Sequence, residues 1–142
     1  MTTDVLTKEQ RRRCMSAIKS SDTKPELAIR SLVHRMGFRF RLHRRDLPGT
    51  PDLVFPRLSK VIFVHGCFWH RHPGCRFATT PVSRREFWLD KFHANRQRDC
   101  RTQRDLQNLG WDILVIWECE IRDEKGIENI ATIIRQFLNS TK

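Results

Sequence analysis

The sequence contains no apolar run long enough to cross a lipid bilayer. Its first residues, Met1 to Asp4, lack the basic stretch and following apolar stretch that mark a secretory signal. No internal repeat, low-complexity stretch or linker interrupts the 142 residues. We therefore expect a single domain over residues 1–142, in the cytoplasm and without a membrane partner.

Acidic residues are scarce: 16 Asp and Glu face 27 Lys and Arg, which leaves a net charge of +11. The basic residues cluster at Arg11–Arg13, from Arg39 to Arg45 and from Arg96 to Arg104. Such an excess favours a polyanionic partner, because each neutralised phosphate releases condensed counterions. The composition favours nucleic-acid binding, and a merely soluble basic protein is the alternative.

Apolar periodicity predicts strands interleaved with helices. A first helix would be capped by Asp22 or Thr23, with Pro25 in its first turn and Gly37 at its end. Extended segments are expected at 38–42, 52–55, 61–64 and 113–117, the middle two as a hairpin and the last as a fully buried strand. A long helix over 83–109 and a final amphipathic helix that turns Ile127, Ile130, Ile134 and Phe137 or Leu138 inward complete an α/β fold with a mixed central sheet flanked by helices.

Five cysteines are an odd number in a chain without an export signal, so a disulfide framework is not expected. Cys67, His72 and Cys75 crowd one short segment, and Cys119 follows the predicted strand at 113–117. Three such residues in one loop and a fourth from a distant element are typical of structural zinc sites. Three cysteines and one histidine would fill the tetrahedral shell and leave no position for substrate. Buried thiols beside a surface histidine are the alternative.

The remaining cysteines, Cys14 and Cys100, lie in polar helical surroundings without neighbouring ligand residues. We interpret them as ordinary residues.

A second group of polar residues lies at the ends of the predicted hairpin. Asp52 begins one strand, and His65 follows the other. Antiparallel pairing would bring Asp52, a hard oxygen ligand suited to Mg²⁺, close to that second end. His65 and His70 titrate near neutrality and could move a proton. Together they suit metal-assisted phosphodiester hydrolysis, although each alone could be a turn or structural residue.

Four motifs carry a resemblance that covers nearly the whole chain, from about Arg12 to Glu120: PGTPD at 48–52, FVHGCFWH at 63–70, EFWL at 86–89 and VIWEC at 115–119. They resemble the very short patch repair (Vsr) family of DNA mismatch endonucleases. The resemblance implies a restriction-endonuclease-like fold. It also implies a Mg²⁺-dependent enzyme that nicks DNA 5′ of the thymine in a T:G mismatch left by deamination of 5-methylcytosine.

The resemblance also implies roles for single residues. Asp52 resembles the family's Mg²⁺-binding carboxylate, and Glu26 resembles a helix-borne carboxylate that supports the metal waters. His70 resembles the general base, and His65 a second catalytic histidine near the scissile phosphate. The zinc ligands would be Cys67, His72, Cys75 and Cys119.

The chain departs from the family pattern at three places. Val64 stands where Thr is typical, but the family uses the main-chain carbonyl of this position as a metal ligand. The zinc loop is one residue longer at Pro73–Gly74. The Glu and Lys of other restriction-type sites are absent after Asp52, and within this family histidines replace them.

DNA contacts are expected from aromatic side chains. Phe68 and Trp69 are consecutive in the metal loop, where large rings could wedge between bases and select mismatched sites. Trp88, Lys91 and Asn95 share one face of the long helix. The alternatives are core packing for the aromatics and a solvated face for the helix. The resemblance implies intercalation by Trp88 and mismatch contacts from the other two.

Residues 1–20 are expected to form a DNA-contacting arm or helix that is poorly ordered without DNA. The resemblance implies that Met15 enters the minor groove, and Arg11, Arg12 and Arg13 would hold phosphates. We expect a monomer on double-stranded DNA that contains a T:G mismatch, followed by downstream repair proteins. A zinc-stabilised DNA-binding module without catalysis and a dimeric restriction endonuclease that cuts both strands remain alternative hypotheses.

Overall fold

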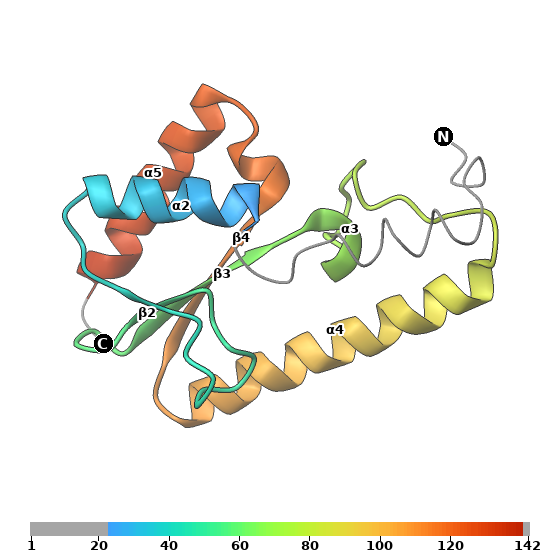
Figure 1. Ribbon diagram of the computed structural model, residues 1–142, viewed down its shortest axis with the longest axis horizontal. Helices are drawn as coiled ribbons and strands as arrows, with labels where there is room; N and C mark the ends of the chain where they lie inside the picture. The colour runs from blue at the N-terminus through green and yellow to red at the C-terminus, as the bar shows by residue number, and fades with distance from the viewer. Residues whose placement is uncertain (1–22, 141–142) are drawn as a thin grey trace.

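The computed structural model describes residues 23–140 and has mixed α/β architecture (Figure 1). Its four-stranded sheet has the order β1-β2-β3-β4 and lies between helices, as expected. The strands are β1 (Arg41–Leu42), β2 (Leu53–Phe55), β3 (Lys60–His65) and β4 (Asp112–Trp117). The helices are α2 (Lys24–Arg35), α3 (Cys67–His70), α4 (Arg85–Asn108) and α5 (Glu124–Asn139), with a 3₁₀ turn η1 (Glu118–Ile121).

The predicted hairpin is confirmed: β2 and β3 pair antiparallel, with Leu53 opposite Ile62. Strands β3 and β4 pair parallel, and His65 lies opposite Trp117 at their carboxyl ends. The connection between these parallel strands passes through α3 and α4, as parallel pairing requires a long crossover. The carboxyl ends of β3 and β4 therefore lie side by side at the same end of the sheet, next to α3.

Both faces of the sheet are covered. Helices α2 and α5 lie together on one face and α4 crosses the other (Figure 1). Successive side chains of β3 alternate between the two cores, because strand residues point to opposite faces in turn. Ile62 joins the α2/α5 core, whereas Val61 and Phe63 join the core that includes Leu106 of α4. Packing in these two cores holds α2 and α4 on opposite faces of the sheet, near the carboxyl end of β3.

The start of α2 follows the predicted signals. The hydroxyl of Thr23 accepts a hydrogen bond from the Glu26 backbone N–H at 3.4 Å, and Pro25 lies in the first turn. The helix ends before Gly37, which has a φ of +90°. The cap fixes the first turn of α2, and thus the position of Glu26, against the sheet.

Two strand predictions are wrong, one in the length of the strand and the other in its burial. The segment 38–42 pairs only at Arg41–Leu42, because its partner β2 has three residues and the ladder ends with it. Strand β4 is not fully buried: only Ile116 is, and its other residues are half-exposed. The reason is its place at the edge of the sheet: within residues 23–140, β4 pairs with β3 on one side and with no strand on the other.

Some expectations concern residues outside the described range. The arm over residues 1–20, with Arg11–Arg13 and Met15, is among them, and so is Cys14. Within residues 23–140, no helix is long and apolar enough to span a bilayer.

Candidate active site and metal centre

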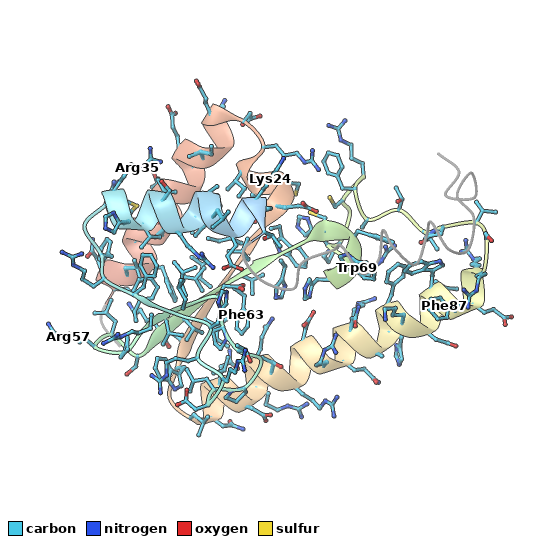
Figure 2. All side chains as sticks on the ribbon, in the orientation of Figure 1. Lys24, Arg35, Arg57, Phe63, Trp69 and Phe87 are labelled. Atoms are coloured by element: carbon cyan, nitrogen blue, oxygen red, sulfur yellow. The ribbon has the colours of Figure 1, made fainter. Side chains whose placement is uncertain are left out.

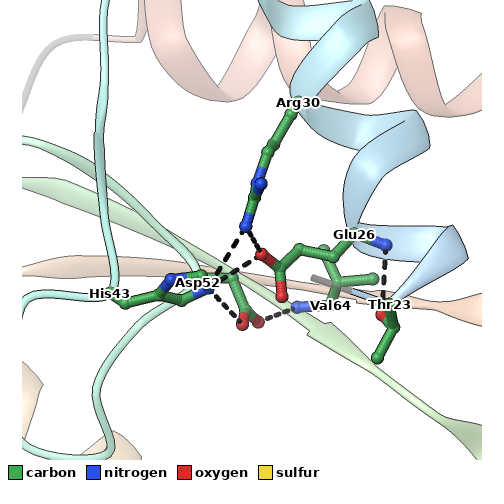
Figure 3. A network of polar contacts seen from close by, with 6 residues as sticks. All are labelled: Thr23, Glu26, Arg30, His43, Asp52 and Val64. Carbon is green, nitrogen blue, oxygen red and sulfur yellow. Dashed lines mark hydrogen bonds and ion pairs between the residues drawn. The ribbon is translucent and has the colours of Figure 1, made fainter. Parts of the chain in front are cut away.

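Asp52 lies where the hairpin prediction placed it, beside the end of β3. Its Oδ2 accepts a hydrogen bond from the Val64 backbone N–H at 2.7 Å (Figure 3). The side chain is thus tied to the strand that carries both Val64 and His65. Antiparallel pairing of β2 and β3 produces this contact, because it returns the chain to the level of Asp52.

Glu26 and His43 complete a group around Asp52 (Figure 3). Glu26 is 2% exposed, and its Oε2 pairs with Arg30 and with His43 Nε2, the latter at 2.8 Å. The same His43 nitrogen lies 3.9 Å from Asp52 Oδ1. Carboxylate and imidazole atoms of these three residues lie within 4.8 Å of one another, a geometry that could hold a metal ion.

His43 was missed in the sequence because it lies within the basic cluster from Arg39 to Arg45, which we interpreted only as part of a charge excess that favours a polyanionic partner. The antiparallel pairing of β1 with β2 could have revealed it. Leu42 pairs with Leu53, so the next residue, His43, falls beside Asp52.

The carboxyl group of Asp52 is electrostatically unfavourable in its ionised form. Burial, with a smaller contribution from the Glu26 carboxylate, raises the pKa of Asp52 to about 7, against the opposing effects of the Val64 N–H and Arg30. A buried carboxyl group with such a pKa lacks a sufficient countercharge. A divalent cation beside it would supply that charge.

Replacing Asp52 with Asn should stabilise the protein when no magnesium is added. The folded protein holds the Asp52 proton up to about pH 7, whereas the ordinary pKa is 3.8, so stability falls as pH rises from about 4 to 7. Asp52→Asn removes this penalty, and we expect a gain of about 2–4 kcal/mol in unfolding free energy at pH 8 and little gain at pH 4. Urea denaturation at both values measures it.

The matched control is Asp46→Asn. Asp46 is exposed, and its hydrogen bond to Arg44 lowers its pKa, so this change should not stabilise the protein at pH 8. Equal stability of Asp52→Asn and wild type at pH 8 would show that the carboxyl group is not strained in this way.

The second group consists of His65, His70 and Asp99. His65 ends β3 and is 6% exposed, and its ring stacks on that of His70 with centroids 3.8 Å apart and planes at 7°. His70 Nδ1 lies 2.6 Å from Asp99 Oδ2 of helix α4. Because a carboxylate only accepts, Nδ1 donates, and the Nε2 of a neutral His70 ring keeps its lone pair.

This arrangement suits proton transfer. Burial, and then the positive charge of a protonated His70, lower the pKa of His65 to about 4, so His65 is neutral at pH 7. Its ligand atoms and those of His70 and Asp99 also lie within 4.8 Å of one another. Parallel stacked rings direct their lone pairs side by side rather than toward one point, which favours an acid–base pair over shared metal ligation.

Asp99 was also missed by the sequence analysis, which treated the segment from Arg96 to Arg104 as a basic cluster. An acidic residue within such a run was the available clue. It lies 29 residues from His70, and only the docking of α4 on α3 brings the two together.

One cavity of about 480 Å³ connects the two groups. His43, Asp52 and Val64 line one part of it, and His65, His70 and Asp99 line another. The cations Arg45 and Arg98 also line it. The cavity therefore combines a candidate metal site, a candidate base and positive charge suited to a phosphate.

The four cysteine and histidine residues predicted to share a metal do converge, with ligand atoms within 4.8 Å. His72 Nδ1 lies 3.8 Å from Cys67 Sγ and 3.3 Å from Cys119 Sγ. Tetrahedral ligands at zinc–ligand distances of about 2.0–2.3 Å are about 3.3–3.8 Å apart. Burial, the largest cause, raises the pKa of the Cys67 thiol to about 12, so a thiolate there requires a cation.

The longer loop before Cys75 does not displace it. Gly74 has a φ of +69°, and the Cys75 N–H donates to the His72 carbonyl at 3.3 Å, so the additional residue forms a tight turn. Cys100 is exposed on α4, in agreement with its interpretation as an ordinary residue.

The sequence analysis expected the consecutive aromatic residues in a loop, but the structure places them in a helical turn. Phe68 and Trp69 belong to the helical turn α3 and are half-buried. The two rings stack with centroids 5.1 Å apart, and both contact Trp88, which is 9% exposed. Figure 2 shows Trp69 between the end of the sheet and helix α4. The rings of Phe68, Trp69 and Trp88 pack together because α3 follows the end of β3 and contacts α4.

Helix α4 contributes the polar neighbours of this cluster. Asn95 Nδ2 donates to the Trp69 carbonyl at 3.2 Å, whereas Lys91 is exposed. Asn95 therefore contacts the turn that carries the aromatic cluster, and the face that it was predicted to share with Lys91 and Trp88 stays a prediction.

Arg71 secures the loop that follows. Its guanidinium donates to the carbonyls of Phe68, Ala78 and Thr79 and to the Thr80 hydroxyl, at 2.8–3.2 Å. It also lies over the Phe92 ring at 3.9 Å. We expect Arg71→Ala to lower the unfolding free energy by about 1–3 kcal/mol, because several carbonyls lose a charged donor.

Thermal denaturation measures this effect, with Arg57→Ala at an exposed position as the control. Arg71→Lys should recover only part of the loss, since an ammonium cannot reproduce the planar fork or its stacking. Similar melting temperatures for all three variants would contradict this role of Arg71.

Comparisons with known proteins identify relatives of this chain. A family model described as DNA mismatch endonuclease Vsr matches residues 3–76. The chain is 52% identical over 126 residues to the type II nicking enzyme V.XorIIP of Xanthomonas oryzae pv. oryzae, covering 89% of this chain and 92% of that protein. It is 42% identical over 128 residues to the DNA mismatch endonuclease Vsr of Escherichia coli K12, covering 90% and 81%.

A third relative, the type II nicking enzyme V.NmeAIP of Neisseria meningitidis serogroup A, is 37% identical over 137 residues, covering 95% of this chain and 96% of its own. This chain belongs to the DNA mismatch endonuclease family Vsr.

Proposed function

We propose that the protein is a Mg²⁺-dependent endonuclease that nicks double-stranded DNA 5′ of the thymine in a T:G mismatch, as a monomer in the cytoplasm. The observation that carries the proposal is the cavity that both Asp52 and the His70–Asp99 pair line, with Glu26 grouped beside Asp52. Family membership and relatives named as nicking enzymes support cleavage of one strand. The mixed sheet between helices is consistent with a restriction-endonuclease-like fold in one domain.

The residues present suit a divalent cation. Asp52 and the Val64 carbonyl would bind it directly, and Glu26 would orient its waters. The raised pKa of Asp52 supports this choice, because a cation would stabilise the ionised carboxylate. When bound, Mg²⁺ would supply Lewis-acid polarisation of the scissile phosphate.

His70 would accept the proton of the attacking water at Nε2. Asp99 holds the opposite nitrogen and would stabilise the imidazolium that forms. His65 is neutral at pH 7 and can donate a hydrogen bond to the phosphate without adding charge. The cations Arg45 and Arg98 at the cavity would attract the phosphate.

The cysteine–histidine cluster would hold a structural Zn²⁺. Cys67 begins α3 and Cys119 lies in η1 beyond β4, so the ion would join these elements at the end of the sheet. The rings of Phe68 and Trp69 would then enter the DNA from a fixed helical turn, assisted by Trp88. A mismatch lowers the cost of unstacking, which is about a few kcal/mol per base step.

Polar and basic residues would complete the DNA interface. Lys91 and Asn95 are proposed to contact the mismatched bases, and the arm with Met15 and Arg11–Arg13 would reach the minor groove and phosphates. The net charge of +11 supports a salt-sensitive complex. Repair proteins would act on the nick.

The test is cleavage of matched 30-base-pair duplexes with T:G or C:G at one position, with and without Mg²⁺. We expect one strand of the T:G duplex to be cut, and neither strand of the C:G duplex. Asp52→Ala should abolish cutting without abolishing binding. Equal cutting of both duplexes would remove the mismatch specificity, and tight binding without cutting would favour a non-catalytic DNA-binding module.

A further inference from the structure

His43 faces the proposed metal site from a side that the sequence motifs do not describe. It follows β1, and its backbone N–H donates to the Asp52 carbonyl at 3.4 Å. Its backbone φ of +48° is in the left-handed region, which residues other than glycine rarely adopt. Held there, the half-buried imidazole lies beside Asp52 (Figure 3). It lines the same cavity as Asp52 and Val64.

The two distances around His43 Nε2 are close to one edge and one diagonal of a coordination octahedron. Two ligands about 2.1 Å from an ion are about 3.0 Å apart when adjacent and about 4.2 Å apart when opposite. Nε2 lies 2.8 Å from Glu26 Oε2 and 3.9 Å from Asp52 Oδ1. One ion could therefore bind His43 Nε2 and Asp52 Oδ1 after small side-chain movements, with Glu26 Oε2 close enough to hold one of its waters.

The surroundings of Nε2 do not commit it to one role. The Glu26 carboxylate is an acceptor, whereas the Arg30 guanidinium, 3.5 Å from the same nitrogen, offers only donors. Nε2 can donate toward the first or present its lone pair beside the second. Arg30 also pairs with Glu26, so that carboxylate keeps a cationic partner if His43 turns to a metal.

We propose that His43 is a further protein ligand of the divalent-cation site at Asp52 and Glu26, and that its nitrogen makes this site prefer first-row transition dications such as Mn²⁺ to Mg²⁺. The inference rests on the proposed function, which places a catalytic cation at Asp52. Imidazole is a borderline-soft donor that transition dications accept readily, whereas Mg²⁺ favours oxygen ligands and its own waters.

The test uses Mn²⁺ as the probe and the full-length, zinc-loaded protein. Pulsed electron paramagnetic resonance detects ¹⁴N directly bound to Mn²⁺, and ¹⁵N-labelled histidine identifies an imidazole source without any substitution. We expect a ¹⁴N signal in wild type that changes on histidine labelling and disappears in His43→Gln. The control, His34→Gln, changes an exposed histidine of α2 and should leave the signal intact.

Calorimetric titration separates ligation from a general structural role. His43→Gln should weaken Mn²⁺ binding about tenfold or more and Mg²⁺ binding by less than threefold. Equal weakening of both ions, or a ¹⁴N signal that persists in His43→Gln, would overturn the proposal. An Asp52-dependent Mn²⁺ site without any histidine signal would also overturn it and leave the proposed function standing.

The Asp52→Ala variant tests whether the cation site lies at Asp52 at all. If it binds Mn²⁺ and Mg²⁺ as wild type does, or if wild type binds neither ion, the cation site itself is misplaced. Both this inference and the metal assignment in the proposed function would then fail.

Discussion

His70→Ala is expected to lower the rate of T:G strand nicking by about 10²–10⁴-fold, the range typical for loss of a general base. The expectation follows from the pairing of His70 Nδ1 with Asp99, which leaves Nε2 to take a proton from water. DNA binding should change little, because His70 is proposed to contact water rather than bases. Single-turnover cleavage with saturating protein measures the chemical step apart from binding.

Two further variants sharpen this result. Asp99→Asn should also cause a loss of about 10²–10⁴-fold, because an amide can donate as well as accept, which allows the wrong His70 tautomer and stabilises the imidazolium less. His93→Ala, at an exposed histidine of α4, should cut at the wild-type rate. Wild-type single-turnover cleavage by the His70→Ala enzyme would show that His70 is not the general base.

The contrast between His70 and Asp99 shows what the sequence could predict. His70 was identified because it lies in the distinctive run from Phe63 to His70, where residues of several roles are adjacent. Asp99 lies on a helix whose charge pattern suggested only a basic surface. Its role depends on the angle at which α4 crosses the sheet, and that angle is set by packing of Leu106 and Phe92 rather than by local pattern.

The same distinction applies to the fold. The β2–β3 hairpin was predicted correctly, because two short apolar runs and an intervening polar turn are local features. The extent of β1 and the burial of β4 were predicted wrongly, because each depends on neighbouring strands. A strand partner ends where its own ladder ends, and an edge strand keeps one open side.

The aromatic residues show a related limit. Consecutive aromatics were expected in a loop, yet Phe68 and Trp69 lie in a helical turn and pack on Trp88 and Phe92. This packing refines the proposed DNA interface. Rings that are stacked together before DNA binding lose less conformational freedom when they enter it. Asn95, bonded to the Trp69 carbonyl, would then link the aromatic cluster to the mismatch contacts.

Replacing Cys119 with Ser should have the second large effect, on both stability and activity. Cys119 connects η1 at the end of β4 to Cys67 and His72 beside β3, so its loss would open the proposed zinc site. We expect the bound zinc to fall from one equivalent toward zero and the unfolding free energy to fall by about 3 kcal/mol or more. The melting temperature should fall by about 10 °C.

Activity should fall with the metal, because Cys67 begins the same four-residue helix that His70 ends. Released from the sheet, α3 would no longer hold His70 against Asp99 or Trp69 against Trp88. Cys100→Ser, at an exposed cysteine outside the cluster, is the matched control and should change stability by less than about 0.5 kcal/mol. If Cys119→Ser retained a full equivalent of zinc and cut T:G duplexes normally, the cluster could not be the anchor of the catalytic helix.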